Sequence, residues 1–223
     1  KRPKMVVLSG GANFAYAGRS SCADAIMEKP HAPSTEKNRE PILAVLREHF
    51  AERREVLEIG SGTGQHAIFF AAAMPHLLWQ TSDCPESLPG IAAWLAEAAL
   101  PNTPPPFALD VVGDWPKRRY DAIFSANTLH IMPWEAVERL FARLPEVLAD
   151  NAKVAIYGPF NYGGCFTSDR KAAFDRSLKE KAPHQGIRDF EKVNALAVQA
   201  GLTLIEDRAM PSNNRCLHWQ AKG

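Results

Sequence analysis

The segment Glu55-Val56-Leu57-Glu58-Ile59-Gly60-Ser61-Gly62-Thr63-Gly64-Gln65-His66 decides the fold of this chain. Its first five residues are a short apolar run that predicts a buried strand, and three glycines at alternate positions follow. From Gln65 to Ala71 the apolar residues return at helical spacing. A strand, a glycine turn and a helix form the first unit of a doubly wound α/β sheet, in which ligands bind beyond the carboxyl ends of the strands.

The glycine spacing and the carboxylate of Glu58 indicate which kind of ligand this turn serves. Its glycines follow G-x-G-x-G, whereas the dinucleotide pattern G-x-G-x-x-G sets the third glycine one position later. A pyrophosphate favours a free helix N-terminus without negative charge nearby. Glu58 stands two residues before Gly60, where it would repel a phosphate and attract a cationic ligand. The alternative is an ordinary strand-to-helix turn whose glycines only make room.

Length and composition predict one globular domain, because 46% of the 223 residues are hydrophobic and can form a sizeable core. The 26 basic residues nearly balance the 25 acidic ones, so no nucleic-acid partner is expected. The four cysteines include no Cys-x-x-Cys pair, so we expect no metal site and a reducing, cytoplasmic location. No apolar run reaches the length of a membrane span, and no membrane association is expected.

Residues 1–33 are expected to form an irregular arm, and residues 34–223 a single domain. Basic residues within positions 1–4 and an apolar run at 5–8 faintly imitate a secretory signal, but the run is too short for one. Beyond the arm, Asn38 is expected to cap an amphipathic helix that has Pro41 in its first turn.

Strands and helices alternate along the rest of the chain, which is typical of a parallel sheet with helices on both faces. Further strands are expected over residues 77–82, 107–109, 120–127 and 154–157, with a closing pair over 202–205 and 215–220. The first of these strands ends at Asp83, about 20 positions beyond the glycine turn, where a carboxylate suits a ribose diol. Asp83 could instead be a helix cap or a turn residue.

Several further motifs follow one another along the chain. They are Asn38-Arg39-x-Pro41-Ile42, Asn127-x-x-His130-Ile131, Tyr157-Gly158-Pro159-Phe160, Thr167-Ser168, Phe174-Asp175, Gly186-Ile187-Arg188-Asp189 and Met210-Pro211-x-Asn213-Asn214. Together with the glycine turn, and over residues 34–223, this series resembles the DUF938 family, also called methyltransferase-like 26. Lys37 and Ser212 depart from the residues that the resemblance leads us to expect.

The resemblance implies a class I methyltransferase fold with S-adenosylmethionine as the cofactor. That fold is α/β and doubly wound, with a seven-stranded, mostly parallel sheet in the order 3-2-1-4-5-7-6 and an antiparallel last strand. It implies that Asp110, after the third strand, accepts from the adenine amino group, although a plain turn residue is the alternative. The residues expected to bind the cofactor are Asn38, Arg39, Glu58, Gly60, Ser61, Gly62, Gly64, Asp83, Asp110 and Asn127.

Methyl transfer from a sulfonium is an in-line displacement in which positioning supplies most of the catalysis. Nitrogen or sulfur acceptors need no strong base, whereas a hydroxyl acceptor usually does. His130 is the candidate base and Tyr162 the weaker one, although either could be a packing or loop residue. Arg39 and Arg188 could bind a carboxylate through two hydrogen bonds or could form surface ion pairs.

The expected acceptor site has apolar walls and a few polar groups, as small-molecule pockets usually do. Its walls are expected to come from Phe160, Tyr162 and Phe166 in the loop over residues 159–167. The residues expected to bind the acceptor are Phe160, Arg188, Asn213 and Asn214. We therefore expect a small organic acceptor of unspecified identity.

Two other functions remain open from the sequence. A nicotinamide-dependent oxidoreductase shares this kind of sheet, although Glu58 and the glycine spacing oppose it. A catalytically silent protein could bind S-adenosylmethionine and act through a protein partner.

Overall fold

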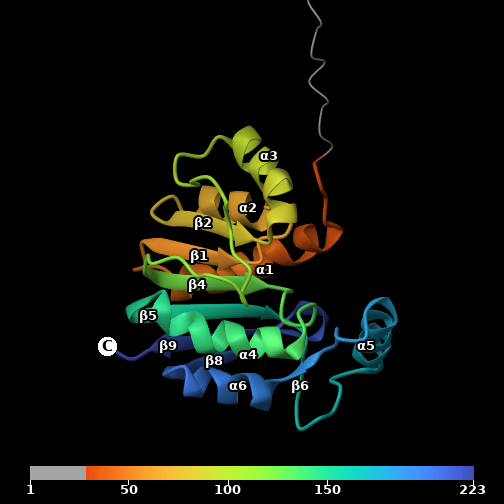
Figure 1. The fold of residues 1–223 in the computed structure, drawn as a ribbon. Helices are drawn as coiled ribbons and strands as arrows, with labels where there is room; N and C mark the ends of the chain where they lie inside the picture. Colours follow the sequence, from red (N-terminus) through yellow and green to blue (C-terminus); the bar gives the residue numbers. More distant parts are fainter. Residues whose placement is uncertain (1–28) are drawn as a thin grey trace, which may run out of the picture.

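The computed structural model describes residues 29–223, which form one seven-stranded sheet with helices on both faces (Figure 1). The order in the sheet is β3-β2-β1-β4-β5-β9-β8. Its strands are β1 (Glu55–Ile59), β2 (Leu78–Asp83), β3 (Phe107–Ala108), β4 (Tyr120–Ala126), β5 (Leu148–Gly158), β8 (Leu202–Met210) and β9 (Asn214–Ala221). Numbered along the chain, these strands follow the predicted order 3-2-1-4-5-7-6. β9 is antiparallel to both of its neighbours, so the predicted fold class is confirmed.

The helices form two layers, one on each face of the sheet. On one face lie α1 (Pro33–His49), α2 (Gln65–Ala73) and α3 (Leu88–Ala98), and on the other lie α4 (Trp134–Arg143) and α6 (Phe190–Gln199). α5 (Asp169–Lys181) stands apart from both layers, beyond the edge where the parallel strands end (Figure 1). Near it, β6 (Phe160–Asn161) pairs with β7 (Arg188–Asp189) in a small second sheet.

Each face of the sheet has its own apolar core. Under α1–α3, the rings of Phe70, Trp79 and Phe124 pack together with centroids 5.4–5.8 Å apart. Under α4 and α6, Phe141 packs edge-on against Trp219 at 6.2 Å. Burying one large apolar side chain contributes about 1.5–3 kcal/mol. The two cores therefore hold the parallel strands rigidly and fix where their carboxyl ends meet.

The N-terminal helix differs from the sequence expectation. α1 begins at Pro33, so Asn38 lies inside the helix, buried, and Pro41 is also internal. A proline at the first helical position is favoured because its fixed φ suits the helix and its missing N–H has no partner there anyway. Residues 1–28 of the expected arm lie outside the described residues, and the boundary at 33/34 stays a prediction.

The closing strands are longer than expected, and β5 starts six residues earlier than position 154. In the pairing of β4 with β5, Tyr120 lies opposite Leu148 and Ala122 lies opposite Lys153, so the register shifts between these two residues. The additional pair at Leu148 extends β5 toward its N-terminus.

Among residues 29–223, no helix has both the length and the apolar character needed to cross a bilayer.

Candidate functional site

The glycine turn after β1 brings the backbone close to the end of β4. Gly60 has φ +74°, and a Cβ there would overlap the Thr128 methyl group. Gly62 has φ +59°, and a Cβ there would meet open space. Glycine is favoured at positive φ because it has no Cβ. Gly60 is therefore required both by its backbone conformation and by close packing, whereas Gly62 borders a space that a ligand could fill.

A cavity of about 560 Å³ opens above this turn, and we call it the glycine-loop cavity. It lies at the carboxyl ends of β1, β2, β3 and β4, as expected for a doubly wound sheet. The predicted site residues that line it are Gly60, Ser61, Gly62, Asp83, Asp110 and Asn127. Those that do not line it are Asn38, Arg39, Glu58 and Gly64.

Asp83 is held at the cavity wall by two backbone hydrogen bonds. Its Oδ2 accepts from the Gly62 N–H at 2.7 Å, and its Oδ1 accepts from the Cys84 N–H at 2.7 Å. A carboxylate has about four acceptor positions, so about two remain for a ligand. The side chain is thus already oriented to accept from two adjacent hydroxyl groups.

Part of the lining of the glycine-loop cavity is apolar and includes a second carboxylate, that of Asp110. Leu109 and Val111 are buried and flank the exposed Asp110 after β3, and all three line the cavity. Met132 and Ala136 add to the apolar lining. An apolar slot with one carboxylate suits a flat ring that carries an amino group.

Glu58 does not reach the cavity wall. Its side chain is 1% exposed, and its Oε2 accepts from the indole N–H of Trp79 at 2.9 Å. Burial raises the pKa of this carboxyl to about 7, against the smaller opposing effect of the Trp79 hydrogen bond. Glu58 lies under the turn, so the expectation that it attracts a cationic ligand directly is not met by the geometry.

His66 lines the glycine-loop cavity, although it was not predicted as a site residue. Its Nε2 donates to Asn38 Oδ1 at 2.7 Å, which explains why Asn38 is buried inside α1. Burial, together with the charge of Arg39, lowers the pKa of His66 to about 4, so the ring is neutral at neutral pH. Arg39 itself stacks on Phe69, with the guanidinium carbon 4.6 Å from the ring centroid. It lines neither this cavity nor the next.

A second cavity, of about 520 Å³, adjoins the first, and we call it the α5 cavity. The two share Ser34, Asn127 and Ile131 as common wall. Asn127 has φ +60° and donates its backbone N–H to Tyr157 O at 2.8 Å. Left-handed backbone is uncommon outside glycine but best tolerated by asparagine. Asn127 therefore turns the chain sharply at the end of β4, where the two cavities meet.

His130, the candidate base, lines the α5 cavity. It is 6% exposed and lies edge-on to Phe174 at 5.6 Å. Burial and the nearby charges of Lys171 and Arg188 lower its pKa to about 4. The neutral ring can accept a hydrogen bond from a ligand, but the same surroundings oppose full protonation.

A chain of polar side chains crosses the floor of the α5 cavity. The Lys171 ammonium donates to Asn214 Oδ1, and Asn214 Nδ2 donates to the Tyr157 hydroxyl at 2.7 Å. All three residues line the cavity, which brings α5, β9 and β5 together at one place.

The loop over residues 159–167 does not form the expected walls. Only Pro159 lines the α5 cavity, whose apolar wall comes instead from Phe174 and Ile131. Phe160 is 1% exposed and belongs to the core beside β5, whereas Phe166 is on the surface.

Tyr162 is also placed away from the two joined cavities. Its hydroxyl donates to Asp207 Oδ2 at 2.7 Å, and its ring stacks on Phe190. Burial and Asp207 both raise the pKa of Tyr162, so the hydroxyl is a poor base. With Asn213 it lines a third, separate cavity of about 300 Å³ that touches the α5 cavity only through Asn214.

Arg188 has a structural role in place of the expected acceptor contact. Its guanidinium donates to three backbone oxygens, those of Leu129, Met132 and His184. It therefore fixes the segment after β4, and lines none of the three cavities.

Lys171 and Phe174 line the α5 cavity, although neither was predicted as a site residue; a signal for them is present in the sequence. Lys171, Phe174, Asp175 and Leu178 recur at helical spacing and form one face of α5. A lysine on that mainly buried face, in the first turn after Ser168, indicates a cation turned toward the protein.

The fold is that of class I S-adenosylmethionine-dependent methyltransferases. The S-adenosylmethionine-dependent methyltransferase SibL superposes with a TM-score of 0.74 at 22% identity, over 85% of this chain and 56% of that one. An O-methyltransferase family protein from Burkholderia thailandensis gives 0.74 at 16%, over 82% and 56%. The mitomycin 7-O-methyltransferase MmcR gives 0.75 at 15%, over 84% and 54%. The chain thus spans about half the length of these structures.

The chain belongs to the DUF938 family, described as a protein of unknown function, whose model matches residues 29–221. The predicted family membership is therefore confirmed, and the family description itself specifies no reaction.

Proposed function

We propose that this protein is an S-adenosylmethionine-dependent methyltransferase that acts on a small-molecule acceptor. The observation that carries the proposal is the junction of the glycine-loop cavity with the α5 cavity at Asn127. One cavity has the features of a nucleoside site, and the other has polar groups around a compact space.

The glycine-loop cavity fits S-adenosylmethionine in size and in donor set. Ligand cavities of this kind usually enclose about 300–1,000 Å³. Asp83 would hold the ribose diol, the apolar slot of Leu109 and Val111 the adenine, and Asp110 its amino group. The turn at Gly62 leaves open space for the sulfonium part of the ligand. His66 is neutral, so it adds a polar group to the cavity without adding a positive charge to that of the sulfonium.

When bound, S-adenosylmethionine would supply an electrophilic methyl group: the acceptor's lone pair forms the new bond to carbon, the carbon–sulfur bond breaks to leave S-adenosylhomocysteine, and any proton on the acceptor passes to solvent. The protein's contribution is to hold that acceptor atom at the Asn127 junction and to exclude water around it. The neutral His130 ring accepts a hydrogen bond from the substrate and so orients it. His130 is a poor store for a proton, because its pKa is low. The geometry thus favours acceptors that need no strong base.

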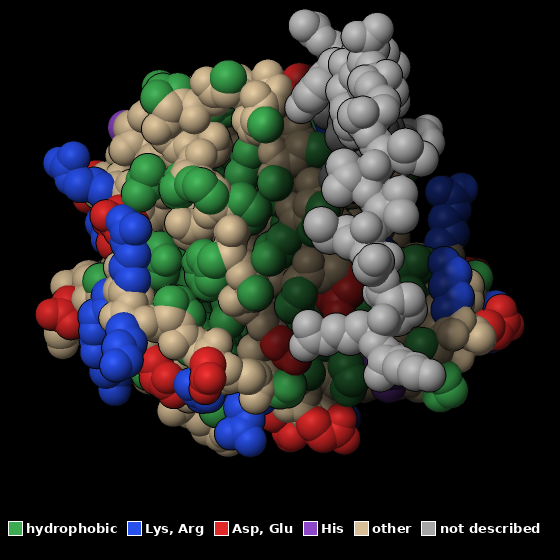
Figure 2. Space-filling view, turned by 45° about the horizontal axis from the view of Figure 1, so that its top comes forward, with side chains coloured by type: hydrophobic (Ala, Val, Ile, Leu, Met, Phe, Trp, Pro, Cys, Tyr) green, Lys and Arg blue, Asp and Glu red, His purple; other side chains and the backbone are tan. Residues whose placement is uncertain are grey.

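The charge balance supports a small acceptor, because 26 basic residues stand against 25 acidic ones. Figure 2 shows basic and acidic side chains mixed around the rim of the one face that it presents. A nucleic-acid acceptor would favour a continuous basic stripe beside the site.

Calorimetry tests the cofactor site directly. Asp83→Ala should weaken S-adenosylmethionine binding by about 1–3 kcal/mol, since it removes a charged hydrogen-bond acceptor. Asp114→Ala is the control, because Asp114 is exposed and does not line the cavity. If wild-type protein binds NAD but neither S-adenosylmethionine nor S-adenosylhomocysteine, the proposal is wrong. Cofactor binding without methyl transfer to any extract metabolite would instead favour a silent binding protein.

A further inference from the structure

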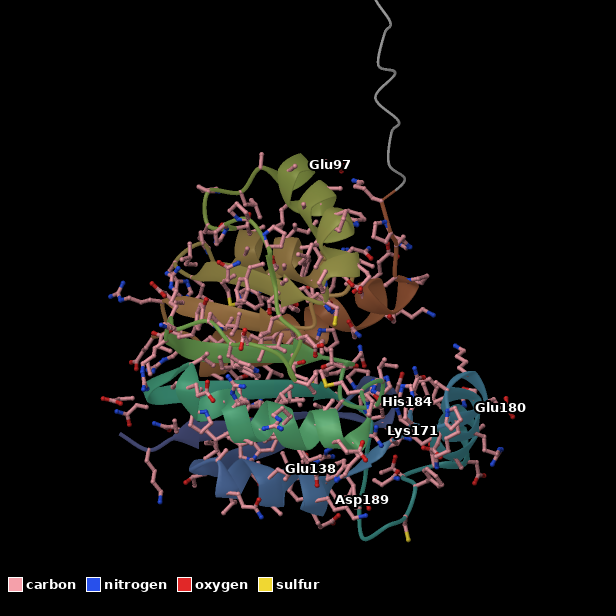
Figure 3. All side chains as sticks on the ribbon, viewed as in Figure 1. Glu97, Glu138, Lys171, Glu180, His184 and Asp189 are labelled. Atoms are coloured by element: carbon pink, nitrogen blue, oxygen red, sulfur yellow. The ribbon has the colours of Figure 1, made fainter. Side chains whose placement is uncertain are left out.

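Lys171 is a buried cation at the floor of the α5 cavity. It lies in the first turn of α5 and is 8% exposed. Figure 3 shows it on the side of α5 that faces the sheet, whereas Glu180 of the same helix lies on the outer side. Its ammonium donates to Asn214 Oδ1 and lies 5.9 Å from the centroid of the Phe174 ring. An ammonium has three donors, so two have no partner among the described residues.

No carboxylate neutralises this ammonium within residues 29–223. Lys171 takes part in no ion pair there, and the lining of the α5 cavity contains no Asp or Glu. Asp175, one turn further along α5, is occupied by Lys179 at 2.6 Å and by the Ile187 N–H at 2.8 Å. Burial lowers the pKa of Lys171, and no acidic side chain opposes that effect. A buried charge without a partner is costly unless something else compensates it.

Other charges around the cavity have the same sign. Lys37 lines its outer part, and like Lys171 it forms no ion pair with the residues that the structure describes. The positive charge of Arg188 acts on His130 together with that of Lys171. The cavity therefore has a positive potential, and the ligand that suits it is negative.

We infer that the acceptor carries an anionic group, a carboxylate or a phosphate, which binds Lys171 while the reacting atom lies at the Asn127 junction. This inference rests on the proposed methyl transfer and specifies its substrate class. The anion would accept from the two unused ammonium donors, and Asn214 would keep the ammonium in place. Lys37 would attract the acceptor at the cavity mouth.

Paired small ligands test the inference in the full chain saturated with S-adenosylhomocysteine. The probes are acetate, benzoate, 4-hydroxybenzoate and phenyl phosphate, with the neutral counterparts acetamide, benzamide, 4-hydroxybenzamide and phenol. We expect at least one anion to bind about tenfold or more tightly than its counterpart, as measured by calorimetry. A preference for the carboxylates or for phenyl phosphate distinguishes the two anion types.

Lys171→Met should abolish this preference, because methionine keeps the length of the side chain without its charge. Lys181→Met removes the same charge from the exposed end of α5 and should retain the preference. Unchanged S-adenosylhomocysteine affinity in Lys171→Met shows that the variant is folded. If no anion binds better than its counterpart, or if Lys171→Met keeps the preference, the inference is wrong even though the cofactor binds. If S-adenosylhomocysteine itself fails to bind wild-type protein, the proposed function fails first.

Discussion

The carboxyl group of Glu58 is buried beneath the glycine turn, and its ionisation opposes folding. Its pKa rises from an ordinary 4.5 to about 7 in the folded protein. A carboxyl group whose pKa is raised by folding contributes stability at a pH below its unfolded-state pKa. That contribution is lost as the pH rises through the folded-state pKa. Each unit of difference corresponds to about 1.4 kcal/mol. We expect the cost of keeping Glu58 to develop between pH 4.5 and 7.

Glu58→Gln should therefore remove this loss, because the amide keeps an oxygen for the Trp79 indole and cannot ionise. The buried histidines His66, His130 and His218 have lowered pKa values, so they destabilise the fold as pH falls below about 6.5. Comparing variant with wild type by urea unfolding cancels their effect. The stability difference should grow from pH 4.5 to 7.5 in favour of Glu58→Gln, while cofactor affinity at pH 7 changes little. A tenfold loss of cofactor affinity in Glu58→Gln would contradict this prediction and show that Glu58 contributes to cofactor binding.

The sequence predicted the residues whose position follows from strand ends and missed those whose direction depends on packing. Asp83 and Asp110 follow strands, so the sheet places them at the cavity edge. Phe160 also follows a strand, yet it turns into the core because β6 pairs with β7. Lys171 lies far from the glycine turn in sequence, and only the placement of α5 brings it to the site. Such contacts depend on tertiary packing, which local pattern does not specify.

At the scale of elements, the glycine turn and the end of β4 fit together through Gly60 and Thr128. A Cβ at Gly60 would overlap the Thr128 Cγ2 atom, whereas one at Gly62 would meet nothing within 4 Å. Both positions have positive φ, which costs alanine about 1–2 kcal/mol. Overpacking adds about 1–3 kcal/mol at Gly60 alone. Gly60→Ala should thus destabilise the protein more than Gly62→Ala.

A second substitution separates the steric part from the backbone part. Thr128→Ser removes Cγ2 and keeps the hydroxyl that pairs with Ser125. Combined with Gly60→Ala, it should recover the overpacking cost and leave only the cost of the positive φ. Chemical denaturation of the four proteins in this double-mutant cycle gives the coupling energy. A coupling energy near zero would mean that the two elements do not contact each other as described.

Residues 30–34, which lead into the first turn of α1, contact several separate parts of the molecule. The Trp94 indole donates to Pro30 O at 2.8 Å, and Gln65 Oε1 accepts from the Ala32 N–H at 2.7 Å. Two residues further on, Ser34 forms part of both cavities. This short segment therefore connects α3, the glycine turn and both ligand spaces. The segment lies within the family match, which spans residues 29–221.

A wall common to two ligands makes their affinities interdependent. If filling the glycine-loop cavity fixes Ser34 and Asn127, the second ligand no longer has to order them, and its dissociation constant falls. Linkage requires the same factor in the opposite direction, so each ligand tightens the other equally. We expect a factor of about 5 or more between S-adenosylhomocysteine and an anion of the series above, measured by calorimetry in both orders of addition. A factor of one in both orders of addition would show that the two ligands bind independently and would contradict this prediction. Because the factor is the same in both directions, each ligand binds more weakly once the other has left, and the linkage favours the state in which both cavities are filled.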